Sequence, residues 1–463
     1  MSVDAPTIAA SKKVGMINLG CAKNLVDAEV MLGSILAQGM SITSDPEEAD
    51  VLVVNTCAFI DSAKEESIDA IFEAHQQRGL QRREGQRLVV SGCMAQRFAK
   101  ELAKEMPEVD AFLGLDQVAE AGSIIERVFQ RETESNHGPL NLVTRHSRYI
   151  PDYDTPRYRL TPPHTAYLKI AEGCNHPCSF CVIPQMRGRH RSRTLDSVVQ
   201  EARHLVKEGV REINLISQDT TYFGMDRWED KAGPRAQVDR TKGEGICQLI
   251  EALDEIEGDF WIRLLYTHPA HWSDDLIEAI GRSRKVARYV DIPLQHIDEG
   301  MLHTMRRETD RAHIEQLIDR MRAGIPGLGI RTTFIVGFPG ETEAQFESLL
   351  EFIDRRRFER LGVFSYSREE GSRAGRLDHQ VHHKTKTRRY REAMALQQRI
   401  AFEQAEAQIG QMRRVLVDSP LSGRTEHDAP EVDARVVFQS PRPTGEFVNA
   451  TITGARGYDL LAE

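Results

Sequence analysis

Short apolar runs alternate with segments of helical periodicity over the first third of the chain. The apolar runs cover 14–21, 51–57 and 88–93, and apolar residues recur at helical spacing over 24–39 and 62–75. Short strands that alternate with helices are typical of a parallel sheet with helices on both faces. The pattern therefore predicts a doubly wound parallel α/β sheet in this region.

The same alternation returns in the middle of the chain, from residue 165 to about 370. Helical patterns such as 195–209 and 312–324 separate the apolar runs there. The runs predicted to be strands are 165–171, 211–217, 260–266, 288–294, 330–336 and 361–366. Six strand–helix units predict a partial (β/α)6 barrel, which would leave a lateral opening wide enough for a macromolecular substrate.

The last part of the chain changes character after a long helical pattern at 384–408. Alternating runs at 415–419, 434–439 and 447–455, separated by Gly and Pro, predict a small antiparallel β-barrel. The expected division of the chain is a first domain at 12–135, a linker at 136–160, the barrel at 161–392 and the last domain at 393–463. The polar stretch 226–245 has no pattern and is expected to be a flexible insertion between barrel units.

Composition narrows the class of protein. The 463 residues include 40% hydrophobic and 28% charged residues, an ordinary balance for a globular protein. No run of about 18 apolar residues predicts a membrane span, and the first dozen residues lack the features of a signal peptide. The sequence therefore predicts a cytoplasmic protein. The formal net charge of −10 gives no support for extensive binding to nucleic acid.

Seven cysteines in a chain of this length do not indicate a disulfide framework. Six of them form two triplets. Cys247 lies in an apolar helical pattern and is expected to be a buried core thiol.

One triplet is compact: Cys174, Cys178 and Cys181 form a C-x3-C-x2-C array just after an apolar run. A four-iron four-sulfur cluster normally takes four thiolates, so three would leave one iron open for chemistry. Zinc is the competing interpretation, but zinc sites usually pair two C-x2-C hooks or add histidines at set spacing. His176 lies inside the loop without a partner at such a spacing.

The other triplet is spread over the first domain. Cys21, Cys57 and Cys93 each follow an apolar run, and they are 36 residues apart. Because the carboxyl ends of parallel strands meet at one sheet edge, the three thiols are expected to converge. The alternative, three small apolar residues that happen to end strands, is less plausible for three positions in register. We infer a second iron–sulfur cluster with three protein thiolates.

The compact array, with Phe180 before its last cysteine, resembles the signature of radical S-adenosylmethionine (SAM) enzymes. The two triplets together resemble the methylthiotransferase family, and in detail its RimO branch. The resembling stretches are LGCAKNLVDAE (19–29), AEGCNHPCSFCVIPQMRGRHRSR (171–193) and EINLISQDTTYFG (212–224). The tRNA-modifying branch tends to have Gly-Cys-Gln-x-Asn at the first cysteine, where this chain has Ala22-Lys23. The resemblance also implies that the last domain is a TRAM domain.

The resemblance implies an enzyme that carries two 4Fe–4S clusters and uses SAM. It would add a methylthio group to the β-carbon of an aspartate in small-ribosomal-subunit protein twelve. The alternative is the same chemistry on an adenosine of the tRNA anticodon loop. The implied partners are the ribosomal protein or the assembled small subunit and an electron donor, with a sulfur donor as a further candidate. A non-catalytic iron–sulfur carrier would have fully ligated clusters, which two three-cysteine sets disfavour.

Further site residues rest on the resemblance or on their position. SAM contacts are expected from Phe180, Ser217, Gln218, Arg263, Gln295, Val336 and Gly337. Arg187 and Arg189 follow the compact array and could grip a substrate carboxylate, because arginine binds carboxylates through two hydrogen bonds. Residues 411–463 contain six Arg, no Lys and eight Asp or Glu, a net charge of −2. This acidity favours a basic protein surface over tRNA as the partner of the last domain.

Overall fold

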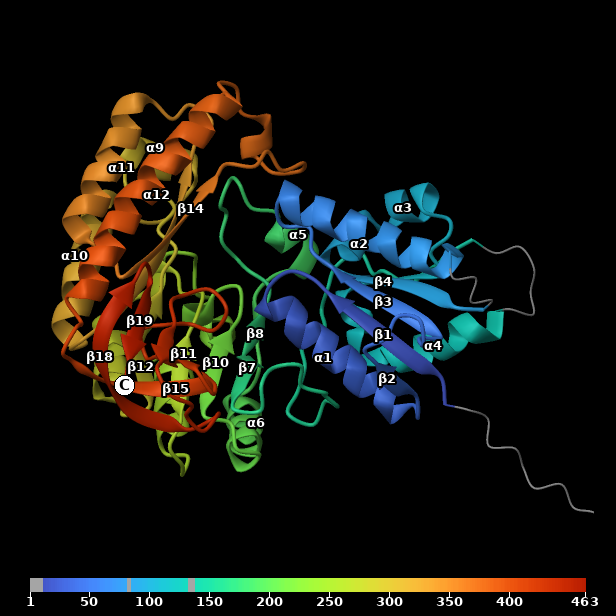
Figure 1. Ribbon diagram of the computed structural model, residues 1–463. Helices are drawn as coiled ribbons and strands as arrows, with labels where there is room; N and C mark the ends of the chain where they lie inside the picture. The colour runs from blue at the N-terminus through green and yellow to red at the C-terminus, as the bar shows by residue number, and fades with distance from the viewer. Residues whose placement is uncertain (1–10, 81–84, 132–137) are drawn as a thin grey trace, which may run out of the picture. The chain divides into compact units, whose positions relative to one another are not determined.

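The computed structural model describes residues 11–80, 85–131 and 138–463 (Figure 1). The chain divides into two compact units. The first unit contains the residues up to Leu160 together with Gln185–Gly188, and the second unit contains Thr161–Pro184 and Arg189–Glu463. The short segment 185–188 therefore follows the second-unit cysteines in sequence but belongs to the first unit.

A six-stranded parallel sheet forms the first unit, in the order β2-β1-β3-β4-β5-β6. Its strands are β1 (Lys13–Asn18), β2 (Ser41–Thr43), β3 (Val51–Thr56), β4 (Arg87–Gly92), β5 (Ala111–Leu113) and β6 (Leu140–Asn141). Its helices are α1 (Ala22–Ala37), α2 (Asp61–Leu80), α3 (Cys93–Glu105), η1 (Leu115–Glu120) and α4 (Ala121–Gln130). Figure 1 shows α2 and α3 on one face of the sheet and α1 and α4 on the other. The predicted doubly wound sheet is confirmed.

The strand order has a switch point between β1 and β3. The chain adds β2 on one side of β1 and then adds β3 and the later strands on the other side. Every residue of β3 is buried, as expected for a central strand covered by helices on both faces. Ligands in such folds bind beyond the carboxyl ends of the strands at a switch point. This end of the sheet is therefore where the first unit can build a site.

The second unit begins with the predicted partial barrel, six parallel strands in the order β7-β10-β11-β12-β13-β14. These are β7 (Thr165–Lys169), β10 (Glu212–Ile216), β11 (Trp261–Leu264), β12 (Val286–Asp291), β13 (Gly329–Val336) and β14 (Arg360–Ser365). The α-helices between and beside them are α5 (Ile183–Arg187), α6 (Leu195–Lys207), α7 (Ile246–Asp254), α8 (Asp274–Arg282), α9 (Glu299–Thr304), α10 (Arg311–Gly324) and α11 (Glu343–Arg356). β7 and β14 are the two open edges, so the barrel is not closed.

Shorter elements lie in the loops at the carboxyl ends of the barrel strands. They are the hairpin of β8 (Ala171–Glu172) with β9 (Arg191–Ser192) and the 3-10 turns η3 (Thr220–Tyr222), η4 (Met225–Arg227), η5 (Pro269–His271) and η6 (Ala374–Arg376). The stretch 226–245 has no regular structure beyond η4, but it is anchored because Trp228 and Val238 are buried in the barrel core.

Helix α12 (His383–Glu406) leads from the barrel into the last domain, so the expected boundary at 392/393 falls inside a helix. The last domain is a closed barrel of β15 (Met412–Ser419), β16 (Ser422–Thr425), β17 (Val436–Phe438), β18 (Phe447–Arg456) and β19 (Asp459–Ala462). Four of its strand pairs are antiparallel as predicted, but β17 pairs with β19 in parallel. The chain crosses over from β17 to β18 instead of turning back directly.

Buried charges join the last domain to the partial barrel. Arg424 forms an ion pair with Glu212 of β10 at 2.7 Å, and Arg360 of β14 pairs with Asp428. Breaking such a buried pair is costly because it leaves an uncompensated charge. These pairs fix the orientation of the last domain on the barrel. No helix among the described residues is long and apolar enough to cross a membrane.

Candidate functional site

The three cysteines of the first unit follow three neighbouring strands of one sheet. Cys21 is the residue before α1, Cys57 follows β3, and Cys93 is the first residue of α3 after β4. The approach of the loops is close: a Cβ added at Gly20 would lie 2.9 Å from the Cys57 Cβ. Gly20 also has a φ of +93°, which only glycine adopts readily. The predicted convergence of the thiols at one sheet edge is found.

Asn24 in the first turn of α1 ties the three cysteine loops together. Its Nδ2 donates to the Leu19 carbonyl at 3.1 Å and to the Thr56 carbonyl at 2.8 Å, and its Oδ1 lies 3.4 Å from the Cys93 Sγ. Sequence reasoning did not select this residue, although it lies in the LGCAKN stretch. Its amide fixes the geometry of the cysteines without being a ligand itself.

Arg187 is a further group at this site. Its Nη2 lies 2.7 Å from Asn24 Oδ1, 3.0 Å from Asp27 Oδ2 and 3.3 Å from Cys93 Sγ, and the residue is 2% exposed. The guanidinium expected to meet substrate is thus engaged with the first cysteine triplet. A buried arginine stays positively charged, so it offsets the charge of nearby thiolates.

The electrostatics of this triplet suit a bound metal group. Burial raises the pKa of Cys93 to about 12, and the neighbouring thiolates of Cys57 and Cys21 act in the same direction. Burial also raises the pKa of Cys57. For Cys21 burial acts against ionisation, but Lys23, Arg187 and the amides at the start of α1 lower its pKa in sum. Thiolates are the ligands of iron–sulfur clusters, and bound iron would supply the positive charge that three adjacent thiolates need. The donor set therefore fits an iron–sulfur cluster.

The second triplet lies in the loop between β8 and α5. Burial and the other two thiolates raise the pKa of Cys174 well above its usual value, and burial raises that of Cys181 to about 12. Arg307 Nη1 lies 3.5 Å from Cys178 Sγ, and the Ile183 amide donates to Cys181 Sγ at 3.4 Å. Three crowded thiols beside a buried cation again fit an iron–sulfur cluster with one iron left without a protein thiolate.

Neighbouring loops hold this cysteine loop in place. The Ser179 amide donates to the Met305 carbonyl at 2.9 Å, its hydroxyl to the Thr304 carbonyl at 2.8 Å, and its carbonyl accepts from Ala374 N at 2.7 Å. Phe180 packs against a cluster that includes Met305 and Phe338. Phe338 belongs to the glycine turn after β13, so the loop and this turn are neighbours.

Two of the residues expected to contact SAM lie beside the cysteine loop. Gln218, at the end of β10, accepts from Gly173 N at 2.6 Å and donates to Glu172 at 2.7 Å. Ser217 is fully buried, and its hydroxyl accepts from Asp219 N at 3.1 Å. Both residues follow a barrel strand directly, at the end where α/β barrels bind ligands.

The glycine turn expected to meet SAM is formed as predicted at the end of β13. Val336 is the buried last residue of β13, and Gly337 follows with a φ of +70°. Gln295 has a φ of +72° and bridges to β13, since its amide donates to Thr333 and its carbonyl accepts from Ile335.

Arg263 and Arg189 have contrasting surroundings. Arg263 is fully buried, pairs with Glu212 at 2.9 Å and donates to the Glu426 carbonyl of the last domain at 2.7 Å. It therefore joins the barrel to the last domain and is occupied with that contact. Arg189, two residues beyond Arg187, is exposed to solvent and is available for a ligand.

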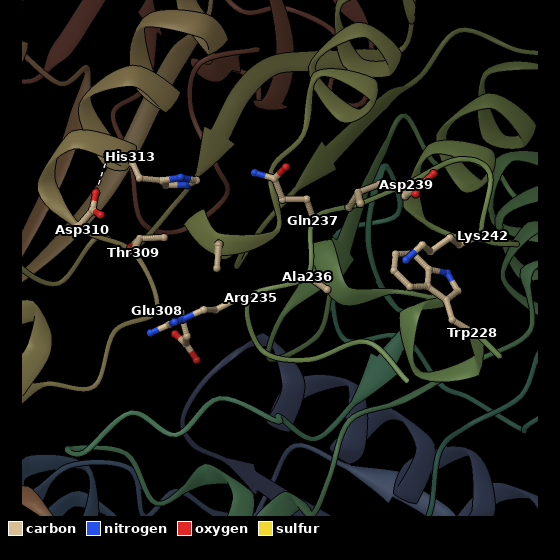
Figure 2. A pocket seen from close by; sticks show the side chains of 12 residues that line it. Trp228, Arg235, Ala236, Gln237, Asp239, Lys242, Glu308, Thr309, Asp310 and His313 are labelled. Atoms are coloured by element: carbon tan, nitrogen blue, oxygen red, sulfur yellow. Dashed lines mark hydrogen bonds between the residues drawn. The ribbon is translucent and has the colours of Figure 1, made fainter. Parts of the chain in front are cut away.

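A cavity of about 590 Å³ opens among the loops after β10, β11 and β12 (Figure 2). Its walls combine an aromatic ring, both signs of charge and amide groups. They are formed by Trp228, Arg235, Ala236, Gln237, Val238, Asp239, Lys242, Ala270, Glu308, Thr309, Asp310 and His313. The cavity lies at the end of the barrel where ligands bind in this architecture.

Three sequence families match the chain. An uncharacterized protein family, UPF0004, matches residues 13–114, the radical SAM superfamily matches 168–353, and the TRAM domain matches 409–463. The superfamily match implies a 4Fe–4S cluster and SAM as cofactors. It covers the three cysteines of the second unit, the end of β7, the barrel strands β10, β11, β12 and β13, and most of α11.

Curated relatives match over almost the whole chain. The ribosomal protein uS12 methylthiotransferase RimO of Opitutus terrae is 57% identical over 97% of this chain and 96% of its own length. The proteins of the same description from Akkermansia muciniphila and Desulforamulus reducens are 54% and 43% identical, each over 97% of this chain and 99% of their own length.

Solved structures share the fold at low sequence identity. The radical SAM methyltransferase TsrM from Kitasatospora setae aligns with a TM-score of 0.52 at 14% identity, covering 79% of this chain and 77% of its own. The cobalamin-dependent SAM radical enzyme OxsB aligns with a TM-score of 0.51 at 11% identity, covering 84% of this chain and 56% of its own. These likenesses concern the arrangement of strands and helices alone.

Proposed function

The chain belongs to the family of ribosomal protein uS12 methylthiotransferases, and we propose that it attaches a methylthio group to the β-carbon of an aspartate in that protein. It is a radical SAM methylthiotransferase. The observation that carries the proposal is the pair of three-thiol sites in one chain, each beside a buried arginine. One chain with two such sites has the parts to generate a radical and to handle sulfur separately.

The two sites would have different roles. Cys174, Cys178 and Cys181 would hold the 4Fe–4S cluster, which with bound SAM supplies a 5′-deoxyadenosyl radical for hydrogen abstraction. We further propose that the triplet of the first unit holds a second 4Fe–4S cluster, which supplies a place for the transferred sulfur. The protein itself would hold the three thiolates of each site in position. The Asn24 amide would do this in the first unit, and the hydrogen-bonded Ser179 backbone would do it in the second.

The overall reaction must balance. A C–H bond of the aspartate breaks and a C–S bond forms. The hydrogen leaves in 5′-deoxyadenosine, and the SAM molecule that supplied this group leaves as methionine. The methyl group comes from a second SAM molecule, which leaves as S-adenosylhomocysteine, and the sulfur comes from a sulfide-class donor. An external reductant supplies the one electron that splits SAM, and one electron is released when the substrate radical joins the sulfide-level sulfur. The proposed activity therefore consumes one equivalent of the sulfur donor in each turnover, and it needs an electron donor to bring the cluster to its reduced state.

For SAM we propose contacts from Phe180, Ser217, Gln218, Gln295 and the Val336–Gly337 turn. The support is that Gln218 bonds to the start of the cysteine loop and that Phe180 packs against the cluster that contains Phe338 of the glycine turn. Arg263 would act on SAM only indirectly, through the barrel strand that carries it, because its guanidinium is taken by Glu212.

For the substrate we propose Arg189 as a contact, since it is exposed and follows the cysteine loop. Arg187 would support the first cluster instead. A ribosomal protein or the small subunit as substrate places the activity in the cytoplasm. The acidic last domain suits a basic protein surface better than tRNA, and the relatives named above are described as acting on uS12.

The test is an anaerobic reaction with reconstituted protein, SAM, sulfide and a strong reductant. A peptide from the ribosomal protein and unmodified tRNA are offered in separate reactions, and mass spectrometry measures the addition of a methylthio group. We expect addition to the aspartate of the peptide and none to tRNA. The matched control is Cys247→Ala, which removes a buried thiol outside both triplets and should retain activity. Addition to tRNA alone would overturn the proposed substrate.

A further inference from the structure

A cluster of buried histidines and carboxylates lies at the carboxyl ends of the barrel strands. His176 comes from the cysteine loop, Asp219 precedes η3 after β10, and His271 ends η5 after β11. Their exposed fractions are 7%, 2% and 0%. His176 has no partner at zinc-site spacing along the chain, but the fold brings one from 95 residues away.

Three potential ligand atoms in this cluster meet at one point. His176 Nε2 lies 2.7 Å from Asp219 Oδ2 and 3.2 Å from His271 Nε2, and His271 Nε2 lies 3.1 Å from Asp219 Oδ2. Ligands bonded to an ion at about 2.1 Å lie about 3.0 Å apart at right angles and about 3.4 Å apart in a tetrahedron. The triangle of atoms thus has the size of one face of a metal coordination sphere.

The other nitrogen of each imidazole is already used as a donor. His271 Nδ1 faces the Ala236 carbonyl at 2.5 Å, and a carbonyl can only accept, so the proton of a neutral His271 is on Nδ1. His176 Nδ1 likewise faces Glu308 Oε1 at 2.9 Å. In the neutral form of each ring, Nε2 is therefore the nitrogen that can bind a metal ion. In the metal-free protein a proton on His176 Nε2 satisfies its contact with Asp219, and a bound ion would replace that proton.

The surroundings match those of metal ligands in proteins. Ligating histidines usually donate their second ring N–H to a carboxylate or a backbone carbonyl, and ligating carboxylates are themselves hydrogen-bonded. His176 and His271 do the first. Asp219 does the second, because its Oδ1 accepts from Thr221 N at 3.1 Å and from Thr221 Oγ1 at 2.6 Å.

We propose that His176, His271 and Asp219 bind one divalent transition-metal ion, separate from the two cysteine sites. Two imidazoles and one carboxylate are the ligands that Zn²⁺ and Fe²⁺ accept. Its route of access is the cavity of Figure 2, because Glu308 and Ala270, which line that cavity, adjoin His176 and His271. The ion would tie the cysteine loop to the loops after β10 and β11.

Two neighbouring side chains make the surroundings of the proposed metal site polar. His268 stacks on His176 with ring centroids 3.6 Å apart. Its Nε2 and the Oε2 of Glu308 are buried without a hydrogen-bond partner among the described residues, 3.5 Å from each other. Unsatisfied buried polar atoms are uncommon in folded proteins, and a metal-bound water is one group that satisfies such atoms.

The experiment measures zinc in the complete protein. Both cysteine sites are first reconstituted with iron and sulfide, Zn²⁺ alone is then added, and unbound metal is removed by gel filtration. Elemental analysis should find about one zinc per chain in the wild type and at least a tenfold loss in His271→Ala, with iron and sulfide unchanged. The matched control is His204→Ala, which removes an exposed histidine of α6 and should keep the zinc.

X-ray absorption at the zinc edge of the wild type is a readout that needs no variant. We expect only nitrogen and oxygen neighbours, at about 2.0–2.2 Å. A sulfur shell at about 2.3 Å would mean that zinc occupies the cysteine sites and would overturn the proposal. The absence of zinc in the wild type, or equal zinc in His271→Ala, would also overturn it. A proton shared by His176 and Asp219 would then account for the contacts.

Discussion

The two cysteine triplets achieve similar surroundings by opposite routes. The first draws its thiols from three strand ends, with successive cysteines 36 positions apart, whereas the second gathers all three within residues 174–181. The first site exists only when β1, β3 and β4 are paired in one sheet. The second has its ligands adjacent even in an unfolded chain, and it depends on clamps such as Ser179 to Met305 for its shape.

Each triplet has a buried arginine near one sulfur, but the two arginines are held differently. Arg187 shares its Nη2 among Cys93, Asn24 and Asp27. Arg307 turns one nitrogen to Cys178 and the other to the Pro293 carbonyl at 2.9 Å. Asp27 balances part of the charge of Arg187. Replacing Arg187 should therefore lower the stability of the fold as well as disturb the cluster.

The largest effect separates the roles of the two triplets. Cys57→Ala and Cys178→Ala should both abolish methylthio transfer, because each leaves its site with two thiolates. Cys57→Ala should still produce 5′-deoxyadenosine from SAM, and Cys178→Ala should not. Chromatography of the SAM products and mass spectrometry of the peptide measure the two activities. If Cys57→Ala also lost SAM cleavage, the proposed division of roles would fail.

The next effect tests the two arginines. Arg187→Met removes the cation from a buried pair, and the Asp27 carboxylate, 6% exposed, loses the guanidinium that lies 3.0 Å from it. Breaking such a pair costs about 3–5 kcal/mol. Urea denaturation followed by circular dichroism measures this loss. Replacing Asp27 as well, in Arg187→Met/Asp27→Asn, should restore part of the stability, because the buried carboxylate is removed together with the cation.

Arg307→Met is the matched change at the second triplet. It should reduce cluster retention or SAM cleavage by about 10–100-fold, the usual effect of losing a group that supports metal ligands. The iron of the first triplet should be unaffected. Equal iron loss from both triplets in Arg307→Met would contradict the view that each arginine serves its own site.

Much of this arrangement could be predicted from the chain. Apolar runs that end in cysteine at equal spacing indicate strand ends, and strand ends of a parallel sheet meet at one edge. The compact array needs no fold at all to be recognised. The partial barrel followed from six apolar runs, because strand-then-helix repeats have few other solutions.

Side-chain partners far apart in sequence could not be predicted. Arg187 follows the second triplet but contacts Asn24 and Cys93, more than 90 residues away. His176 and His271 meet only because the loops of neighbouring strands do. Arg263 was expected near SAM since polar residues on barrel strands often line a site, yet Glu212 on the next strand neutralises it. No local pattern distinguishes these outcomes.

A smaller effect tests how far the first site depends on loop approach. In Gly20→Ala the new Cβ would lie 2.9 Å from the Cys57 Cβ, at a φ of +93°. Gly39→Ala is the matched control, because its φ of +79° carries the same strain of about 1–2 kcal/mol with open space around it. Iron analysis should find the first triplet depleted only in Gly20→Ala. Equal iron in both variants would mean that the Cys57 loop can move away from the new Cβ without loss of the cluster.

The smallest effect concerns acid stability, which should distinguish the two units that carry the triplets. In the second unit burial would raise the pKa of Glu212, but Arg424 and Arg263 outweigh it and lower that pKa. A carboxyl group whose pKa is lower in the folded than in the unfolded protein stabilises the folded state fully above the unfolded pKa, which is about 4.3 for Glu. This stabilisation is lost as the pH falls through the pKa of the folded state.

All three tryptophans, Trp228, Trp261 and Trp272, lie in the second unit, so their fluorescence reports its unfolding alone. Urea midpoints measured by fluorescence should therefore fall as the pH drops below about 4.3. In Glu212→Gln the midpoint should be lower at neutral pH, because two arginines lose their shared carboxylate, but it should fall less steeply with acid. An unchanged acid slope in this variant would assign the acid sensitivity to other carboxylates, of which Asp428 beside Arg360 is the first to test.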